Sequence, residues 1–436
     1  MLHAEPEDRA PDPLAWLAPI LWPDGRTRLV ATGDAGRPAA TGGAARRRPR
    51  STAAGWWGSP EAGAPRILIP AGAPRAARRA VRRYHDGFTP GRRLKSLVAE
   101  ATMLVPAVAS ATLRRHHVRI ETDPGAARGV VEWLGELLDE PDLVVAVSLS
   151  IPKSNRKPVL QLLTADGICL GWAKVAWSPI SEALVANEAH WLTRPAVAPL
   201  LTPELLHDVE LCGRRVVVAS PVDVARRPRR RPDAPPAPTI LRAVAGRGST
   251  GRVRLVESAW WQSVDAVRAD ATDAEWTAIT ATATAVGDRR LEVGAWHGDL
   301  TPWNLMTTRR GVQLIDWELA ADGVPVGFDL CHFHTQVGAE MRGATPAAAL
   351  DRSARLSPQG LAELGIDPAE RGLVWRLYLV ELVRRAIALR TAGYPTERLT
   401  SGPAALDRLS AMARREAAPG PVTSTTTSTT TEAVER

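Results

Sequence analysis

The segment from Trp296 to Glu318 constrains the fold more than any other part of the chain. It reads WHGDLTPWN, then nine further residues, and then an acidic residue between apolar ones, LIDWE. The spacing puts Asp299, Asn304 and Asp316 in one strand–loop–strand unit, where a tight loop directs the first two side chains into one cleft. One carboxylate to deprotonate a hydroxyl, with an amide oxygen and a second carboxylate to hold a divalent cation, meets the needs of Mg²⁺-dependent phosphoryl transfer. The segment therefore predicts a phosphoryl-transfer site.

The sequence before this segment carries a second, independent pattern. Apolar runs predict strands over residues 143–149, 158–163, 168–177, 206–212 and 214–220. The third strand contains Lys174, and a helix that starts near Ser181 contains Glu188. A lysine on the third strand and a glutamate on the next helix form the pair that positions nucleotide phosphates in kinases. The alternative for Lys174 is a side chain that only reaches the surface.

The motifs HGDLTPWN and LIDWE resemble the aminoglycoside phosphotransferase and choline kinase-like family, small-molecule relatives of the protein kinases. Over residues 141–417, the resemblance implies an α+β, bilobal protein kinase-like fold with a five-stranded antiparallel N-lobe and a mainly helical C-lobe. It implies ATP and Mg²⁺ as cofactors, with GTP left open. Asp299 would be the catalytic base, and Asn304 and Asp316 the magnesium ligands. His297 would brace the catalytic loop, and Asp329 would support it.

The first hairpin loop departs from the family pattern. It reads IPKSNRKP and has no glycine-rich phosphate cover. We expect Ser154, Asn155 and backbone N–H groups to contact the nucleotide, with Lys153 or Lys157 adding charge. The alternative is a solvated basic hairpin.

Composition limits the compartment and the partners. The three cysteines are far apart and lack CxxC spacing, which favours a reducing cytosol over a disulfide framework or a zinc site. No apolar run approaches the ~20 residues of a membrane span, and the N-terminus lacks the apolar core of a signal peptide. We therefore expect a cytoplasmic protein without a membrane span. The sequence does not predict its oligomeric state.

The net charge of +8 comes largely from two arginine clusters, at residues 46–50 and 226–231. Both clusters lie among Pro, Ala and Gly without interleaved aromatic residues, so solvated linkers are favoured over a nucleic-acid surface. No nucleic-acid partner is expected. The second cluster could draw an anionic substrate toward the cleft.

The chain divides into segments of different composition. We expect a largely disordered N-terminal segment (1–64), a small α-rich subdomain (65–140), a nucleotide-binding lobe (141–222), an Arg/Pro linker (223–238), a helical catalytic lobe (239–417) and a disordered Ser/Thr-rich tail (418–436). In the catalytic lobe, Cys331, His332 and His334 are interpreted as packing residues, because no second pair of metal ligands accompanies them. Glu318 has two open interpretations, a structural hydrogen bond or indirect contact with a second metal ion.

The acceptor is predicted from what the motifs lack. Protein kinases carry a loop like HRDLKPEN, whereas Thr301 stands at the lysine position here, DWE replaces DFG, and no APE-like segment follows. A small-molecule hydroxyl substrate is therefore favoured. Arginine outnumbers acid over residues 371–415, which predicts a neutral or anionic sugar or amino-alcohol metabolite and not a polycationic aminoglycoside. A pseudokinase or scaffold and a protein kinase-like enzyme stay as alternatives.

Overall fold

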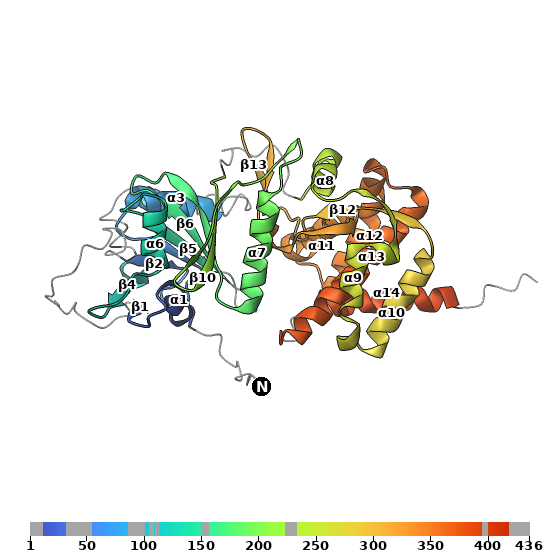
Figure 1. Cartoon of the computed structure of the whole chain (residues 1–436), viewed down its shortest axis with the longest axis horizontal. Helices are drawn as coiled ribbons and strands as arrows, with labels where there is room; N and C mark the ends of the chain where they lie inside the picture. The colour runs from blue at the N-terminus through green and yellow to red at the C-terminus, as the bar shows by residue number, and fades with distance from the viewer. Residues whose placement is uncertain are drawn as a thin grey trace, which may run out of the picture.

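The structure, a computed structural model, describes residues 12–31, 55–85, 101–103, 109, 111, 113–149, 157–222, 233–394 and 400–417. Ser154, Asn155, the arginine cluster at 226–231 and the tail 418–436 lie outside the described residues. In Figure 1 a large sheet with α1, α3 and α6 lies at one end of the molecule. Helices α9 to α14 lie at the other end, and α7 lies between the two parts.

Over the residues that the structure describes, the large sheet has nine strands, each antiparallel to its neighbours. Its order is β1 (Thr27–Ala31), β4 (His117–Thr122), β2 (Trp56–Ser59), β3 (Ile67–Pro70), β5 (Val144–Leu149), β6 (Pro158–Leu163), β7 (Cys169–Val175), β10 (Arg214–Ala219) and β9 (Leu205–Leu211). The five strands expected from the apolar runs are the contiguous set β5–β6–β7–β10–β9. The count of five was wrong, because β3 pairs with the free edge of β5 and the sheet continues beyond it. That pairing satisfies backbone groups that an open edge would expose.

The N-terminal region also differs from the expectation. Part of the segment expected to be disordered forms α1 (Pro13–Leu21), β1 and β2. Asp12 caps α1, and apolar side chains of α1, including Leu17, pack into the core of the sheet. The indole of Trp56 donates to the carbonyl oxygen of Val145 on β5 at 2.7 Å. The segment is thus tied to the sheet by burial and by a buried hydrogen bond, neither of which its Gly-, Pro- and Arg-rich composition reveals.

The next segment, expected to be α-rich, is mixed. It contains β3 and β4 besides α3 (Pro74–His85), the short η1 (Arg114–His116) and α6 (Val130–Leu137). Glu132 on α6 accepts from the indole nitrogen of Trp22, at 3.1 and 3.3 Å for its two oxygens. The described residues between 13 and 149 therefore extend the sheet and cover it, and among them no separate helical unit is found.

Helix α7 (Pro179–Thr193) follows β7 and borders the site. Ser178 caps it, and Pro179 occupies its first turn, where a missing N–H costs nothing. Val185 and Ala189 pack against Val217 of β10. This packing fixes the helix face that carries Glu188 relative to β7.

The remaining chain is mainly helical and has its own hydrophobic core. Its helices are α8 (Pro238–Ala245), α9 (Ala259–Asp265), α10 (Asp273–Val286), α11 (Phe328–Gln336), α12 (Pro346–Glu363), α13 (Pro368–Thr391) and α14 (Ser401–Ala417). Two small sheets accompany them: β11 (Gly251–Arg254), β12 (Arg290–Trp296) and β15 (Ala321–Pro325); β13 (Leu305–Thr307), β14 (Val312–Leu314) and β8 (Leu200–Leu201). The mixture of helices and sheet confirms the α+β class. Within the described ranges, no helix is both long and apolar enough to span a bilayer.

Candidate active site

The loop of residues 297–304 connects β12 to β13. Asn304 lies at its end, where the Nδ2 group donates to the backbone oxygen of Asp299 at 2.9 Å and to Oδ2 of the same residue at 3.0 Å. The carbonyl oxygen of Asn304 accepts from Ile315 N at 3.1 Å, which joins the loop to the strand that delivers Asp316. The structure therefore brings Asp299 and Asn304 into direct contact and leaves Oδ1 of Asn304 as the acceptor atom of its amide.

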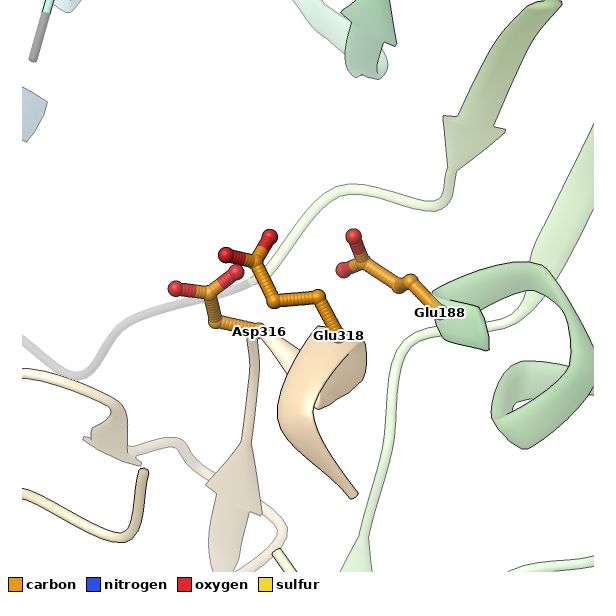
Figure 2. A group of neighbouring side chains, drawn as sticks. All are labelled: Glu188, Asp316 and Glu318. Atoms are coloured by element: carbon orange, nitrogen blue, oxygen red, sulfur yellow. The ribbon is translucent and has the colours of Figure 1, made fainter. Parts of the chain in front are cut away.

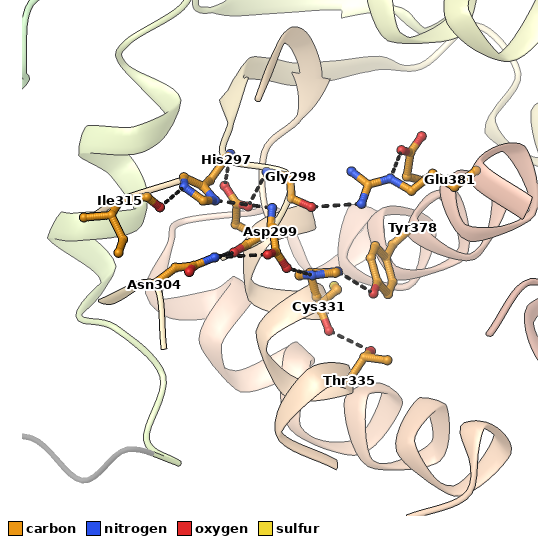
Figure 3. A network of polar contacts seen from close by, with 12 residues as sticks. His297, Gly298, Asp299, Asn304, Ile315, Cys331, Thr335, Tyr378 and Glu381 are labelled. Atoms are coloured by element: carbon orange, nitrogen blue, oxygen red, sulfur yellow. Dashed lines mark hydrogen bonds and ion pairs between the residues drawn. The ribbon is translucent and has the colours of Figure 1, made fainter. Parts of the chain in front are cut away.

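The buried Asp329 and His297 hold the backbone of this loop, and Figure 3 shows His297, Gly298 and Asp299 in one polar network. Asp329 accepts from the N–H groups of His297 and Gly298, at 2.8 and 3.3 Å. The His297 ring lies 2.9 Å from the carbonyl oxygen of Ile315 through Nε2, and Nδ1 lies 3.3 Å from the Asp299 N–H. Burial lowers the pKa of His297 to about 4, so the ring is neutral at pH 7. Nε2–H then donates to Ile315, and Nδ1 accepts from Asp299.

The turn itself requires glycine. Gly298 has a φ of 81°, and a Cβ at this position would collide with the carbonyl group of Leu319. This close approach packs the loop against the DWE segment.

On the other side of the site, two lysines and three carboxylates form what we call the lysine cluster: Lys157, Lys174, Glu188, Asp316 and Glu318. Lys174 Nζ pairs with Glu188 at 2.5 Å and with Glu318 at 3.1 Å, and it also bonds Asp316. Lys157, which is 7% exposed, pairs with Glu318. Figure 2 shows the three acidic side chains turned toward one another, and each offers an oxygen within 4.8 Å of the others.

The close charges shift the pKa values in the lysine cluster. Burial favours the neutral form of Asp316, but Lys174 and Lys157 together hold its pKa well below the usual range. Burial raises the pKa of Glu188 to about 7 against the opposing effect of Lys174. Burial also opposes the charge on Lys174, but Asp316, Glu188 and Glu318 raise its pKa well above the usual value. Lys174 and Asp316 are therefore the firmly charged pair.

Helix α7 is fastened to the DWE segment. The side-chain amide of Asn187 donates to the carbonyl oxygens of Glu318 and Ala320, at 2.8 and 2.9 Å. The ring of Trp191 on α7 stacks on the ring of Trp317 in the DWE segment, with centroids 6.1 Å apart. The guanidinium of Arg247 also lies over the Trp317 ring, 4.1 Å from its centroid. Glu188, on the same helix as Asn187 and Trp191, is thereby held beside Lys174 and Asp316.

Three residues that join the contacts around Asp299 were not predicted as site residues from the sequence: His332, Tyr378 and Arg385. His332 was interpreted as packing; it is buried, but its Nε2 also lies 3.2 Å from Oδ1 of Asp299, and its Nδ1 lies 3.2 Å from the hydroxyl of Tyr378. Arg385 donates to the carbonyl oxygen of Gly298 at 2.9 Å. One signal could have found His332: it lies three residues after Asp329, on the same helical face.

These contacts define the second half of the site, which we call the loop cluster: His297, Asp299, Asn304, Asp329 and His332. The Asp299 side chain keeps 30% of its surface exposed, so a ligand can reach it. The lysine cluster offers cations to an anionic ligand, and Asn304 Oδ1 with the Asp316 carboxylate offers the oxygen ligands that hard cations prefer. The arrangement therefore suits a reaction between a hydroxyl group and a phosphorylated, metal-bound partner.

Comparison with known proteins gives one family match. Residues 229–364 match the model of the "Phosphotransferase enzyme family", a segment that includes the whole loop cluster and Asp316 and Glu318. The match confirms the resemblance based on HGDLTPWN and LIDWE, and with it the phosphotransferase enzyme class. No curated protein sequence matches the chain.

Several solved structures are similar at low sequence identity. A thermostable mutant of aminoglycoside phosphotransferase APH(4)-Ia, in its apo form, is 14% identical, with a TM-score of 0.43 over 66% of this chain and 100% of that one. Macrolide 2'-phosphotransferase MphH from Brachybacterium faecium is 14% identical, with a TM-score of 0.37 over 63% of this chain and 97% of that one. The amicoumacin kinase hAmiN, in complex with AMP-PNP, Ca²⁺ and Ami, is 11% identical, with a TM-score of 0.37 over 62% and 88%. At these values, nothing about the activity of this chain follows from the likenesses.

Proposed function

On the premise that residues 229–364 match a phosphotransferase family, we propose that this protein transfers the γ-phosphoryl group of ATP to a hydroxyl group of a small molecule. One observation carries the proposal: Asp299 and Asn304 meet in one loop, and the strand after that loop brings Asp316 to Lys174 and Glu188. The residues that we propose as base, cation ligands and phosphate-binding lysine thus come together from elements far apart in the sequence. We take the sheet part and the helical part as the two lobes of a kinase-like fold.

In the proposed reaction, Asp299 orients the acceptor hydroxyl and takes its proton. The oxygen of that hydroxyl attacks the γ-phosphorus in line, and the bond to the ADP oxygen breaks. Lys174 binds the α- and β-phosphates, and Glu188 orients Lys174. Asn304 Oδ1 and the Asp316 carboxylate would hold Mg²⁺, which, when bound, neutralises charge on the phosphates.

Lys157 is proposed as a second phosphate contact. Lys157 stands at the end of the hairpin loop IPKSNRKP, which has no glycine-rich sequence. The ammonium group of Lys157 pairs with the same Glu318 carboxylate that Lys174 contacts. Lys157 and Lys174, which both pair with Glu318, can both bind the phosphate oxygens of a nucleotide in its place. The contacts proposed for Ser154 and Asn155 belong to the same hairpin and stay proposals.

The acceptor is proposed to be a neutral or anionic sugar or amino-alcohol metabolite. A polycationic acceptor needs several unpaired carboxylates. Glu381 on α13, whose partner Arg385 bonds the loop at Gly298, is instead fully buried and paired with Arg384 and Arg385. Several arginines of this region are also paired, Arg390 with Glu275 among them. The charge excess of the sequence is therefore partly neutralised, which supports the neutral acceptors most directly.

Labelled ATP tests the proposal. Purified protein is incubated with γ-labelled ATP, Mg²⁺ and panels of sugars, amino alcohols, aminoglycosides and unfolded polypeptide. Transfer to a sugar or amino alcohol, lost in Asp299→Asn, is the expected result. Label in polypeptide would identify a protein kinase-like enzyme, and ATP binding without transfer to any panel would favour a pseudokinase.

A further inference from the structure

His332 links the proposed base to the helical core. It lies on α11, three residues after Asp329, so the two side chains leave the same face of the helix. Asp329 accepts from the backbone of His297 and Gly298, while Nε2 of His332 lies 3.2 Å from Oδ1 of Asp299. One helix face therefore contacts both the backbone of the catalytic loop and its carboxylate.

The partners of His332 fix the direction of its hydrogen bonds. An ionised carboxylate can only accept, so Nε2 must carry a hydrogen. In the neutral ring, Nδ1 is then an acceptor, and the hydroxyl of Tyr378, 3.2 Å away, donates to it. Burial raises the pKa of Tyr378 well above its usual value, so this hydroxyl keeps its proton. The chain of donors runs from Tyr378 through His332 to Asp299.

The second oxygen of Asp299 is held from another side. Oδ2 accepts from Asn304 Nδ2 at 3.0 Å, and that amide also bonds the Asp299 backbone oxygen. A carboxylate between two N–H donors has a defined plane, and its other lone pairs stay available on the exposed side. Figure 3 shows the polar network that runs from Asn304 through Asp299 to Tyr378.

We propose that His332 is a positioning residue for phosphoryl transfer, and that Tyr378 selects the tautomer in which His332 donates to Asp299. The proposal rests on the proposed role of Asp299 as base. The acceptor O–H bond breaks, its proton goes to Asp299, its electron pair forms the new bond to γ-phosphorus, and the bond from phosphorus to the ADP oxygen breaks. His332 gains and loses no proton; its Nε2–H holds the carboxylate in the orientation that receives one.

Kinetics with matched variants test this role. His332→Leu removes the donor, His332→Gln keeps an amide N–H near the position of Nε2, and Tyr378→Phe removes only the hydroxyl. The probe is MgATP, with water as acceptor and with any acceptor identified by the labelled-ATP panels. His332→Leu should lower kcat about 10–100-fold, the effect of losing one hydrogen bond to a charged group, while KM for MgATP is unchanged. His332→Gln should recover most of this loss, and Tyr378→Phe should lie between the wild type and His332→Leu.

The outcomes separate this inference from the proposed function. Equal losses in His332→Leu and His332→Gln, or a loss seen only as lower thermal stability, would overturn the positioning role. If Asp299→Asn is inactive and His332→Leu is fully active, the inference fails and the proposed function stands. If Asp299→Asn keeps wild-type activity, the proposed function itself fails.

A spectroscopic test needs no acceptor. Long-range ¹H–¹⁵N spectra of protein labelled with ¹⁵N-histidine report which ring nitrogen carries hydrogen in each of the nine histidines, and the His332→Gln variant identifies the signal of His332. We expect a protonated Nε2 and an unprotonated Nδ1 in the wild type, with a shifted tautomer population in Tyr378→Phe. A wild-type ring that carries its hydrogen on Nδ1 alone would contradict the proposal.

Discussion

The lysine cluster and the loop cluster lie on the two sides of one site but are held together differently. In the lysine cluster, two ammonium groups and three carboxylates pair directly with one another. In the loop cluster, Asp299 receives hydrogen bonds from the side chain of Asn304 and from His332, and Asp329 receives them from the backbone. A charged ligand has to share or replace the ion pairs of the first cluster, whereas the hydrogen bonds of the second can persist when it binds. We therefore expect the lysine cluster to rearrange when a charged ligand binds, and the loop cluster to keep its conformation.

The largest expected effect lies in the loop cluster. Asp299→Asn should lower phosphoryl transfer by about 10²–10⁴-fold, the usual effect of a positioned general base. The substitution keeps the size of the side chain, and Asp299 belongs to no ion pair of the lysine cluster, so ATP affinity should change little. Steady-state transfer with labelled ATP and calorimetric titration of MgATP measure the two quantities. Equal losses of transfer and of affinity would break the comparison, because the two clusters would then act as one binding unit.

Asp316→Ala should abolish the dependence of ATP affinity on Mg²⁺. Asp316 offers the anionic oxygen closest to Lys174, and its pKa lies well below the usual range, so it is charged throughout the neutral range. Calorimetry with MgATP, and with ATP in the presence of a chelator, measures the difference. Glu318→Gln is the matched control, since it removes a neighbouring charge and should keep the metal dependence. If the two variants behave alike, the cation does not bind at Asp316.

Within the same cluster, Lys157→Ala should weaken MgATP binding by about 10-fold, consistent with the loss of one charged hydrogen bond. Lys153→Ala, in the same hairpin sequence, serves as the control. Kd values from calorimetry, with thermal unfolding as a check on folding, distinguish a phosphate contact from packing. A fall in melting temperature with unchanged Kd would make Lys157 a structural partner of Glu318 only.

The smallest expected effect concerns pH. Burial lowers the pKa of His297 to about 4, whereas an unfolded histidine titrates near 6.5. Between these values the unfolded chain binds a proton that the folded chain does not, so the contribution of His297 to stability is complete above about pH 6.5 and is lost as the pH falls through 4. Glu188 and Asp329, whose pKa values are raised to about 7, contribute with the opposite sign over much of this range.

His297→Gln should therefore change the pH slope of the unfolding free energy. Between about pH 6.5 and 4, the slope of unfolding free energy against pH should be smaller in the variant by up to about 1.4 kcal/mol per pH unit, the value for a difference of one bound proton. Acidification should therefore destabilise the variant less than the wild type. Denaturant unfolding at several pH values measures the slope. An unchanged slope would mean that the folded protein binds the His297 proton over the same pH range as the unfolded chain, and it would contradict the lowered pKa.

The sequence predicted the central part of the fold because that part is locally encoded. The apolar runs over 158–163 and 214–220 are found as β6 and β10. The outer strands β1, β2 and β4 were missed because their pairing is not local. Thr27 pairs with Thr122, and Trp56 pairs with Val118, each across a long stretch of chain in which the sequence gives no sign of the partner.

The candidate site divides in the same way. HGDLTPWN and LIDWE encode a strand–loop–strand unit in which Asn304 reaches Asp299 over five residues. The contact from His332 to Asp299 spans 33 residues, and the contact from His332 to Tyr378 spans 46. Such contacts depend on how α11 packs against α13 and the loop. The step of three residues from Asp329 to His332 indicates only that the two side chains share a helix face. The roles proposed for Ser154 and Asn155 depend on residues outside the described ranges.

A crystal structure with Mn²⁺ and AMP-PNP tests most directly the claim that the two clusters form one phosphoryl-transfer site. We predict an anomalous Mn²⁺ peak next to Asn304 Oδ1 and the Asp316 carboxylate. Lys174 should have moved from Asp316 onto the phosphates, and the bonds of Asp299 to Asn304 and His332 should be unchanged. A metal ion bound elsewhere, or a nucleotide bound while Lys174 stays paired with Asp316, would contradict it.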